Sequence, residues 1–232
     1  MTYSLEINNL TKIYNKKKNS GIFDLNFKVK KGDFHAFIGE NGAGKTTTIK
    51  SIIGALSNID GEILIDGINN KLIASKQKLA YVPEVMLFPE NLTTWNYLTL
   101  LSNLNNIVDI ETKINNLLDI FEISHLKNKN PNQMSSGQKK KIILIQALLN
   151  EPDLLILDEP ASNLDPTARY QLFKLLKELN QKGTTIFISS HILSELDQYV
   201  NSFTLIHQGQ IIDSGVKTKN LEELFYEKII NN

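Results

Sequence analysis

The stretch Gly39-Glu40-Asn41-Gly42-Ala43-Gly44-Lys45-Thr46 matches the pattern Gly-x-x-x-x-Gly-Lys-Ser/Thr of a phosphate-binding loop. The apolar segment 34–38 precedes the loop and predicts a strand. Apolar residues recur after the loop at helical spacing, at Ile49, Ile52, Ile53 and Leu56. The strand, loop and helix that the motif requires are therefore all predicted, and together they indicate a site for a nucleoside triphosphate.

The residue types of this loop suit a polyphosphate. Glycines let backbone N–H groups turn inward without a Cβ in the way, and the start of a helix favours an anion. Lys45 would add a positive charge for the β- and γ-phosphates, and the Thr46 hydroxyl would bind Mg²⁺. The predicted nucleotide-binding residues of this segment are Gly39, Glu40, Asn41, Gly42, Ala43, Gly44, Lys45, Thr46 and Thr47.

The composition excludes several other classes of protein. The 25 Lys and Arg residues balance the 25 Asp and Glu residues, so no overall positive field recruits nucleic acid. Cysteine is absent, which excludes disulfides, thiol catalysis and thiolate metal sites, and the 4 scattered histidines do not favour structural zinc. No apolar run approaches the roughly 18 to 20 residues that cross a bilayer, and no secretory signal pattern is present. We expect a soluble chain that stays in the cytoplasm.

The order of predicted elements favours an α/β fold. The 232 residues, 41% of them apolar, suit one large domain with an inserted lobe. Residues 4–38 predict short strands with turns, 61–67 predict another strand, and 85–149 predict a helical lobe. Strands at 154–157 and 184–190 flank a helix from Pro166, so we expect a mostly parallel sheet with helices on its faces. The lysine runs 16–18 and 139–141 are expected to be solvated surface.

Two adjacent acids, Asp158 and Glu159, follow the aliphatic strand 154–157. Open α/β sheets place their ligands at this end of their strands. Asp158 would hold Mg²⁺, directly or through water, and Glu159 would polarise the water that attacks the γ-phosphate. The alternative, a strand that merely ends in a polar turn, is less favoured beside a phosphate-binding loop.

Three further segments narrow the family. Met134-Ser135-Ser136-Gly137-Gln138 is a small, donor-rich helix start that suits a γ-phosphate, although an ordinary serine N-cap is the alternative. Ser162-Asn163-Leu164-Asp165 comes after the acids, and His191 ends the next strand. This order resembles the ATP-binding cassette (ABC) family of ATPases over nearly the whole chain. Residues 134–138 resemble its Leu-Ser-Gly-Gly-Gln signature, with Ser136 in place of a glycine, and the other two segments match its D-loop and its switch histidine.

The resemblance implies roles for individual residues. Lys45, Glu159 and His191 would be catalytic, and Ser135, Ser136, Gly137 and Gln138 would contact nucleotide. Tyr14 falls where the family stacks an aromatic ring on adenine, with a core tyrosine as the alternative. Glu84 stands where most members have the glutamine of the Q-loop; its oxygen remains available to Mg²⁺, but it brings a negative charge near the triphosphate. The metal ligands would therefore be Thr46, Glu84 and Asp158.

The resemblance also implies an architecture and partners. One domain, 1–232, would consist of a P-loop NTPase core with an N-terminal antiparallel β subdomain (1–84 and 150–232) and an inserted helical subdomain (85–149). Two subunits would pair head to tail, as a homodimer or a heterodimer, with each ATP between 39–47 of one chain and 135–138 of the other.

The function that the resemblance implies is the ATP-hydrolysing subunit of a membrane transporter, with separate transmembrane permease subunits that hold it at the inner face of the membrane. The Glu84 loop and the segment 88–93 resemble the exporter-type branch of the family. Residues 85–89 would offer apolar contacts to the permease, or would pack within the helical lobe. The alternative is a soluble ABC ATPase that acts on nucleic acid or in cofactor assembly, but no basic arm or tandem cassette supports it, and no nucleic-acid partner is expected.

Overall fold

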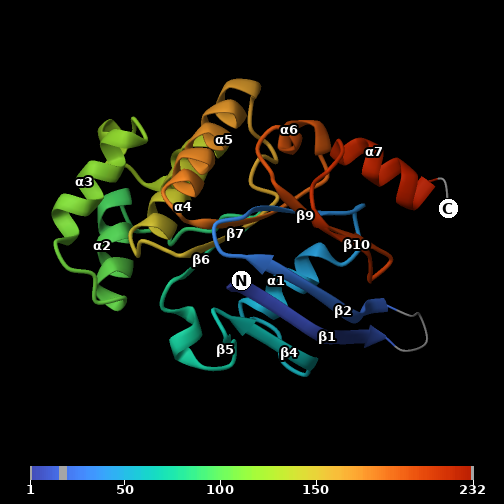
Figure 1. Cartoon of the computed structure of the whole chain (residues 1–232). Helices are drawn as coiled ribbons and strands as arrows, with labels where there is room; N and C mark the ends of the chain where they lie inside the picture. The colour runs from blue at the N-terminus through green and yellow to red at the C-terminus, as the bar shows by residue number, and fades with distance from the viewer. Residues whose placement is uncertain (1, 16–19, 231–232) are drawn as a thin grey trace.

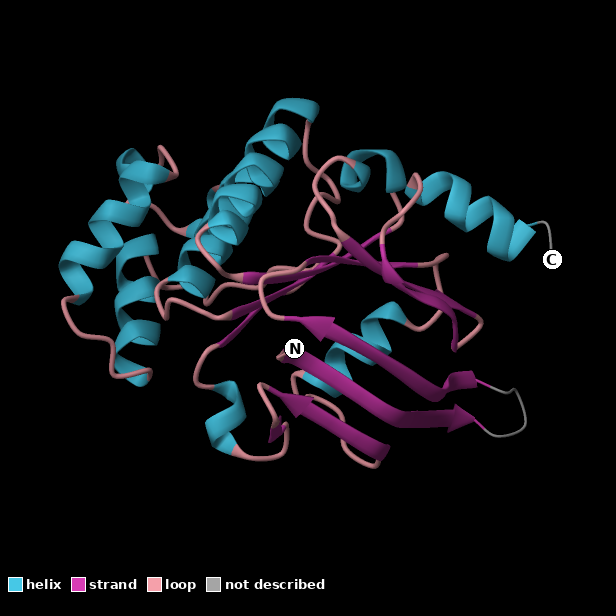
Figure 2. Ribbon diagram, in the orientation of Figure 1, coloured by secondary structure: helices cyan, strands magenta, loops and turns pink. Residues whose placement is uncertain are grey.

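The computed structural model describes residues 2–15 and 20–230, which form two sheets and a set of helices (Figures 1 and 2). The first sheet has the order β2-β1-β4-β5, and the second has the order β10-β9-β3-β8-β7-β6. In Figure 1 the N-terminal sheet lies below the second sheet, and most helices lie above the second sheet. The lysine run 16–18 lies outside the described residues.

The N-terminal sheet is antiparallel, as expected. It contains β1 (Tyr3–Asn15), β2 (Ser20–Lys30), β4 (Asp60–Ile65) and β5 (Ile68–Asn69). The prediction of short strands is wrong for this region, because β1 and β2 have 13 and 11 residues and form one long antiparallel pair. Register shifts interrupt the pairing at four points, and such bulges let a long pair bend and twist without ending.

The second sheet is mostly parallel. Its strands are β3 (Phe34–Ile38), β6 (Leu79–Val82), β7 (Leu154–Asp158), β8 (Thr185–Ser190), β9 (Ser202–His207) and β10 (Gln210–Val216), and only β10 pairs antiparallel. Every residue of β3, β7 and β8 is buried, which explains their nearly continuous apolar sequences. These three strands are neighbours, so their carboxyl ends bring the phosphate-binding loop, Asp158 and His191 to one edge.

The helices pack on both faces of the second sheet. They are α1 (Lys45–Ile52), α2 (Thr94–Leu104), α3 (Ile110–Ile120), α4 (Ser136–Leu148), α5 (Pro166–Gln181), α6 (Leu193–Asp197) and α7 (Leu221–Phe225). Four short segments add a turn each: η1 (Ile73–Lys76), η2 (Ser124–Leu126), η3 (Pro131–Gln133) and the π-helical η4 (Tyr226–Ile230). No helix among residues 2–15 and 20–230 is long and apolar enough to cross a membrane.

Helix α1 is shorter than its apolar pattern suggested. Ile53 is its C-cap, and Gly54 has the left-handed φ of 77°. Gly54 N–H donates to Ser51 C=O, and Ala55 N–H donates to Lys50 C=O at 2.8 Å, which is the double hydrogen bond of a Schellman motif. The helix therefore stops before Leu56.

The helical lobe consists of α2, α3 and the start of α4, at the left in Figure 1. Leu98 and Leu118 are buried in it, whereas Leu104 is exposed at the end of α2. The same apolar cluster continues into α5 and the sheet, so the lobe and the sheet share one core.

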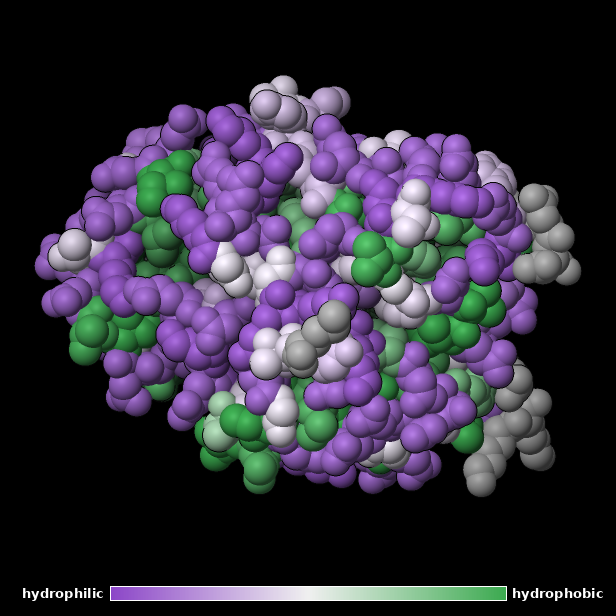
Figure 3. Space-filling view, in the orientation of Figure 1, coloured by the Kyte–Doolittle hydropathy of each residue, from purple (hydrophilic) through white to green (hydrophobic). Residues whose placement is uncertain are grey.

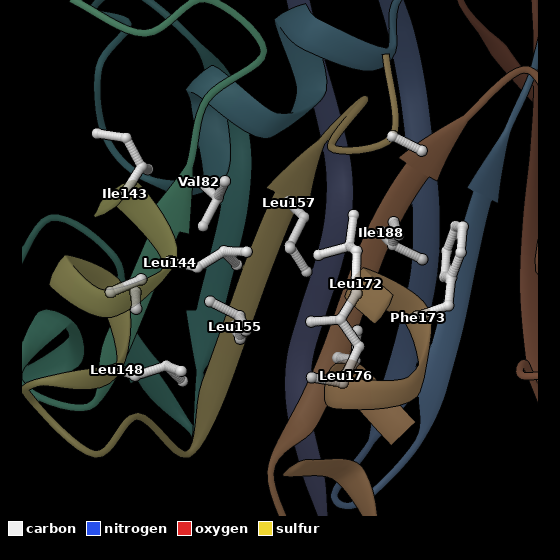
Figure 4. Close-up of a cluster of buried hydrophobic side chains, with 14 of the residues drawn as sticks. Val82, Ile143, Leu144, Leu148, Leu155, Leu157, Leu172, Phe173, Leu176 and Ile188 are labelled. Carbon is white, nitrogen blue, oxygen red and sulfur yellow. The ribbon is translucent and has the colours of Figure 1, made fainter. Parts of the chain in front are cut away.

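Strand alternation divides the core between the two faces of the second sheet. On one face, Leu155 and Leu157 of β7 meet side chains of α4 and α5 (Figure 4). On the other face, Leu154 and Ile156 join the cluster that includes α1 and the N-terminal sheet. The face of the molecule in Figure 3 is mainly hydrophilic, with hydrophobic residues in separate patches.

Candidate nucleotide site

The phosphate-binding loop leaves β3 and enters α1 in a conformation that needs glycine. Gly42 and Gly44 have φ values of 81° and 114°, which disfavour residues with a Cβ. A Cβ on Gly39 would lie 2.3 Å from the Ile206 carbonyl oxygen, and one on Gly44 would lie 2.6 Å from Cγ2 of Ile22. The glycines therefore allow the loop to lie against β9 and β2 while it curves into the helix.

The turn between β9 and β10 fixes the loop from the other side. Gly209 N–H donates to Ala43 C=O at 2.9 Å, and its own carbonyl accepts from Phe23 N–H at 2.8 Å. His207 Nδ1 lies 3.2 Å from a carboxylate oxygen of Glu40. This turn therefore links the loop to the N-terminal sheet.

The ammonium of Lys45 is buried at the centre of the loop. It donates to the carbonyl oxygens of Gly39 at 2.7 Å and Glu40 at 3.2 Å, and it lies 3.4 Å from Oε1 of Glu159. The loop carbonyls and one carboxylate thus hold a positive charge at the place where the motif predicts the β- and γ-phosphates.

Asp158 and Glu159 have different environments. Asp158 is buried and accepts a 2.7 Å hydrogen bond from the Ser189 hydroxyl, whose oxygen accepts from Glu159 N–H at 3.0 Å. Glu159 has a φ of 43°, a left-handed conformation that costs about 1 kcal/mol or more for residues other than glycine. The Ser162 hydroxyl donates to the Glu159 carbonyl at 2.8 Å and helps to hold that conformation.

The Glu159 carboxylate stands between two cationic or polar neighbours. Its Oε2 is 2.9 Å from Nδ1 of His191, and its Oε1 faces Lys45. Within the described part of the chain, Oε1 is buried and accepts no hydrogen bond. A buried carboxylate oxygen that accepts no hydrogen bond is costly even beside a cation, so this atom is suited to accept one from a bound water or substrate group.

A hollow of about 360 Å³ opens beside these groups. It is lined by Glu40, Asn41, Gly42, Gly44, Lys45, Thr46, Thr47, Glu84, Glu159 and His191. Most of the predicted site residues are thus brought together, including Glu84 from the loop after β6. Gly39 and Ala43 are buried behind the loop, and Asp158 lies beneath the lining.

Tyr14 is placed near the end of β1, outside the lining of this hollow. Its ring is 55% exposed, so the alternative of a core tyrosine is wrong. The Lys12 ammonium lies 5.7 Å from the ring centroid. The exposed ring is available for stacking.

The segment that resembles the family signature lies outside the hollow, at the start of α4. Ser135 is the N-cap: its hydroxyl accepts from Gln138 N–H at 3.3 Å, and Gln138 Oε1 accepts from Ser135 N–H at 3.1 Å. The Ser136 hydroxyl donates to the Asn163 carbonyl of the D-loop segment at 2.9 Å. The serine that departs from the family pattern therefore connects two motifs.

The lysine run 139–141 is not solvated surface, which corrects the sequence-based prediction. Lys140 is only 2% exposed, and its ammonium donates to the Pro83 carbonyl at 3.4 Å. The Lys141 ammonium donates to the Phe121 carbonyl at 2.9 Å. A sequence signal existed, because Lys140 lies four residues before the buried Leu144 on the same face of the helix.

The surroundings of Lys140 are acidic as well as buried. Burial lowers the pKa of the Lys140 ammonium to about 8, while the charges of Glu84 and Asp158 act in the opposite direction. Burial, followed by the same two carboxylates, raises the pKa of Tyr81 to about 12. Both Lys140 and Tyr81 therefore lie within the electric field of Glu84 and Asp158.

The residues present fit Mg²⁺ bound together with a triphosphate. The Thr46 hydroxyl and the Glu84 carboxylate line the hollow, and both are oxygen ligands of the kind that Mg²⁺ prefers. Among residues 2–15 and 20–230, no three His, Asp or Glu side chains gather into a protein-only metal site. The fit is therefore to a metal that takes further oxygen ligands from phosphate and water.

Comparisons with known proteins identify the family of this chain. Residues 22–162 match the family described as ABC transporter. A putative ABC transporter ATP-binding protein of Mycoplasma pneumoniae is 48% identical, with 93% of this chain and 68% of the relative covered. The bacitracin transport ATP-binding protein BcrA of Bacillus licheniformis is 37% identical, with 92% of this chain and 70% of the relative covered.

A solved structure of an ABC transporter subunit has the same fold as this chain. The structure of an ATP binding subunit of an ABC transporter superposes with a TM-score of 0.86 at 32% identity, and the match covers 96% of this chain and 98% of the other. The chain therefore belongs to the ABC transporter family, as an ATP-binding subunit that hydrolyses ATP.

Proposed function

We propose that the hollow beside the phosphate-binding loop is the hydrolytic site, with Glu159 as the residue that orients and polarises the attacking water. The observation that carries this assignment is the Glu159 carboxylate: its Oε2 contacts His191, and its buried Oε1 faces the Lys45 ammonium at 3.4 Å but accepts no hydrogen bond. Lys45 and His191 would stabilise the charge that develops on the γ-phosphate. The loop 39–47 would hold the phosphates, and the exposed ring of Tyr14 would stack on adenine.

Thr46, Glu84 and Asp158 would hold Mg²⁺, Asp158 through water because it lies beneath the lining of the hollow. When bound, the ion would neutralise charge on the β- and γ-phosphates. Ser189 positions the Asp158 carboxylate and the Glu159 backbone together through its hydroxyl. This shared contact would keep the metal ligand and the water-orienting residue in a fixed relation.

The direct test of these roles compares Glu159→Gln with the wild-type chain. We expect steady phosphate release to fall by on the order of 10²- to 10³-fold, because a positioned base contributes about that much. ATP binding, measured with a fluorescent ATP analogue, should persist because Lys45 and the loop are unchanged. Release within a few-fold of wild type would move the catalytic role to another residue.

The segment 135–138 would act on the ATP of a second subunit. Ser135 and Ser136 are exposed at the start of α4 and outside the hollow of their own chain. The N-terminus of α4 supplies backbone N–H groups and a favourable dipole for a γ-phosphate. Pairing of two subunits, identical or related, would bring this helix start to the partner's nucleotide.

The partners would be transmembrane permease subunits that hold the chain at the inner face of the membrane. Val85 and Leu87 are 70% and 84% exposed, whereas Met86 and Phe88 pack into the core. The alternating pattern leaves Val85 and Leu87, at the start of the helical lobe 85–149, for contact with a permease. The similarity to a bacitracin transport ATP-binding protein supports a role in transport, and export is the direction that we propose.

Co-purification tests this partnership. Tagged Glu159→Gln chain with Mg-ATP would be extracted in mild detergent, with Val85→Ser/Leu87→Ser in the same background as the matched control. We expect a polytopic membrane protein to be retained by the first chain and reduced with the second. Recovery of only soluble or nucleic-acid partners would contradict the transporter assembly.

A further inference from the structure

Lys140 is a buried cation that the proposed mechanism does not use. It lies in the second turn of α4, and its side chain is 2% exposed. Burial of an ammonium group is costly unless hydrogen bonds and opposite charges compensate for the lost water. Its hydrogen bond to the Pro83 carbonyl is long, at 3.4 Å, so neighbouring charges must supply part of the compensation.

Those charges belong to the metal position of the proposed site. Pro83 directly precedes Glu84, whose carboxylate lines the hollow. Val82 of β6 pairs with Leu157 of β7, so the next residues, Pro83 and Asp158, continue from adjacent strand ends. Lys140 approaches this edge from α4. The negative charges of Glu84 and Asp158 both favour its charged form and so raise its pKa against the effect of burial.

We propose that Lys140 is a positioning residue that holds the loop at 83–84 and offsets the negative charge of Glu84, thereby linking the metal position to the start of its own signature helix. The proposal rests on the role of Glu84 proposed above. Glu84 places a carboxylate in the lining of the hollow where the triphosphate would bind. A carboxylate there would repel the triphosphate, and a buried ammonium nearby weakens that repulsion.

The same contact gives the loop a mechanical connection to the signature segment. Lys140 follows Gln138 by two residues on α4, and the capping box of Ser135 and Gln138 starts that helix. A displacement of the loop at 83–84 therefore acts on a rigid element whose first turn would face the partner's ATP. Helix α4 as a rigid element would therefore couple the loop at 83–84 to the signature segment.

A double-mutant cycle tests the proposal. The four chains are wild type, Lys140→Met, Glu84→Gln and the combination of both, each checked for folding by thermal unfolding. Methionine keeps the apolar part of the lysine side chain, so the cycle removes mainly the charge. The measured quantity is the Kd for Mg-ATP, obtained by displacement of a fluorescent ATP analogue.

We expect Lys140→Met to weaken Mg-ATP binding by about fivefold more in the wild-type background than in the Glu84→Gln background, because charges in one network couple. Lys141→Met removes the same charge from the next position, where the ammonium binds the Phe121 carbonyl. Its effect on Kd should be the same in both backgrounds. A merely structural Lys140 would also give equal effects in both backgrounds, and that result would overturn the proposal.

The experiment distinguishes failure of the proposed nucleotide site from failure of the inference about Lys140. If Lys140→Met does not fold, the cycle is repeated with Lys140→Gln, a neutral polar side chain that can still donate to the Pro83 carbonyl. Failure of the wild-type chain to bind Mg-ATP, or binding unaffected by Lys45→Ala, would refute the proposed nucleotide site itself. Binding that depends on Lys45 but shows no coupling between Lys140 and Glu84 would refute only the inference about Lys140.

Discussion

His35 shows how a single residue makes the stability of the fold depend on pH. Its ring is buried in β3, between the hydroxyls of Ser202 at 2.8 Å and Thr204 at 2.9 Å, and it stacks on Phe187 with centroids 5.5 Å apart. Burial lowers the pKa of His35 to about 3 from the ordinary 6.5. Between these values the unfolded chain binds a proton that the folded chain does not, so stability falls as the pH falls through this window.

For His35 we predict that the free energy of unfolding depends more steeply on pH in the wild-type chain than in His35→Phe. Between pH 6.5 and pH 4, its contribution should lower the free energy of unfolding by up to about 1.4 kcal/mol per pH unit. His35→Phe should remove that contribution while it keeps an aromatic ring, because Ser202 and Thr204 retain bonds to Asp33 and Ser214. Urea unfolding at several pH values measures it, with the exposed His125→Phe as control. Equal slopes for wild type and His35→Phe would refute the assignment.

At the scale of the element, the end of α1 depends on one glycine. Gly54→Ala should cost about 1 kcal/mol, because alanine is strained at a φ of 77°. The added Cβ would clash only with the end of the long Lys76 side chain, which can move aside, and it would lie at ordinary contact distance from the Asn70 carbonyl oxygen, so contacts should add little to that cost. Gly215→Ala, in β10, has open space and no left-handed φ, and it should be close to neutral. Chemical unfolding of both variants checks the difference, and equal effects would mean that the φ of Gly54 is not the cause.

The elements also show what the sequence could and could not predict. The phosphate-binding loop, the strand of β7 and the helix from Pro166 follow from local patterns, and the parallel sheet follows from their alternation. The end of α1 is less clear, because Gly54 indicates a helix stop whereas the apolar spacing up to Leu56 predicts a longer helix. The length of β1 and β2 could not be read from turn signals, because bulges let one long pair continue where short strands were expected. The burial of Lys140 is hidden by its charge, because the Pro83 carbonyl that it contacts lies 57 residues away; only its helical spacing to Leu144 indicates a buried position.

At the scale of the whole molecule, the two segments that the proposed pairing would bring to one ATP lie apart in a single chain. The phosphate-binding loop, Glu159 and His191 line one hollow, while the start of α4 presents its donors elsewhere. Two copies, or a copy and a related chain, would complete both sites at once. ATP would then act as a ligand that favours the closed pair over the open one.

Gly137→Glu should separate closure of the pair from nucleotide binding. The position is in the first turn of α4, where an acid suits the helix dipole, and a Cβ there would meet nothing closer than 3.9 Å. The new carboxylate would nevertheless repel the partner's γ-phosphate. In the Glu159→Gln background with Mg-ATP, we expect a dimer by light scattering, its loss with Gly137→Glu, and its retention with Gln171→Glu on the exposed side of α5. Binding of the fluorescent ATP analogue should persist in all three chains, because the hollow itself is unchanged, and it should be weaker only to the extent that closure of the pair tightens it. A dimer that survives Gly137→Glu would mean that the two chains meet through another face, and the signature segment would then need a different role.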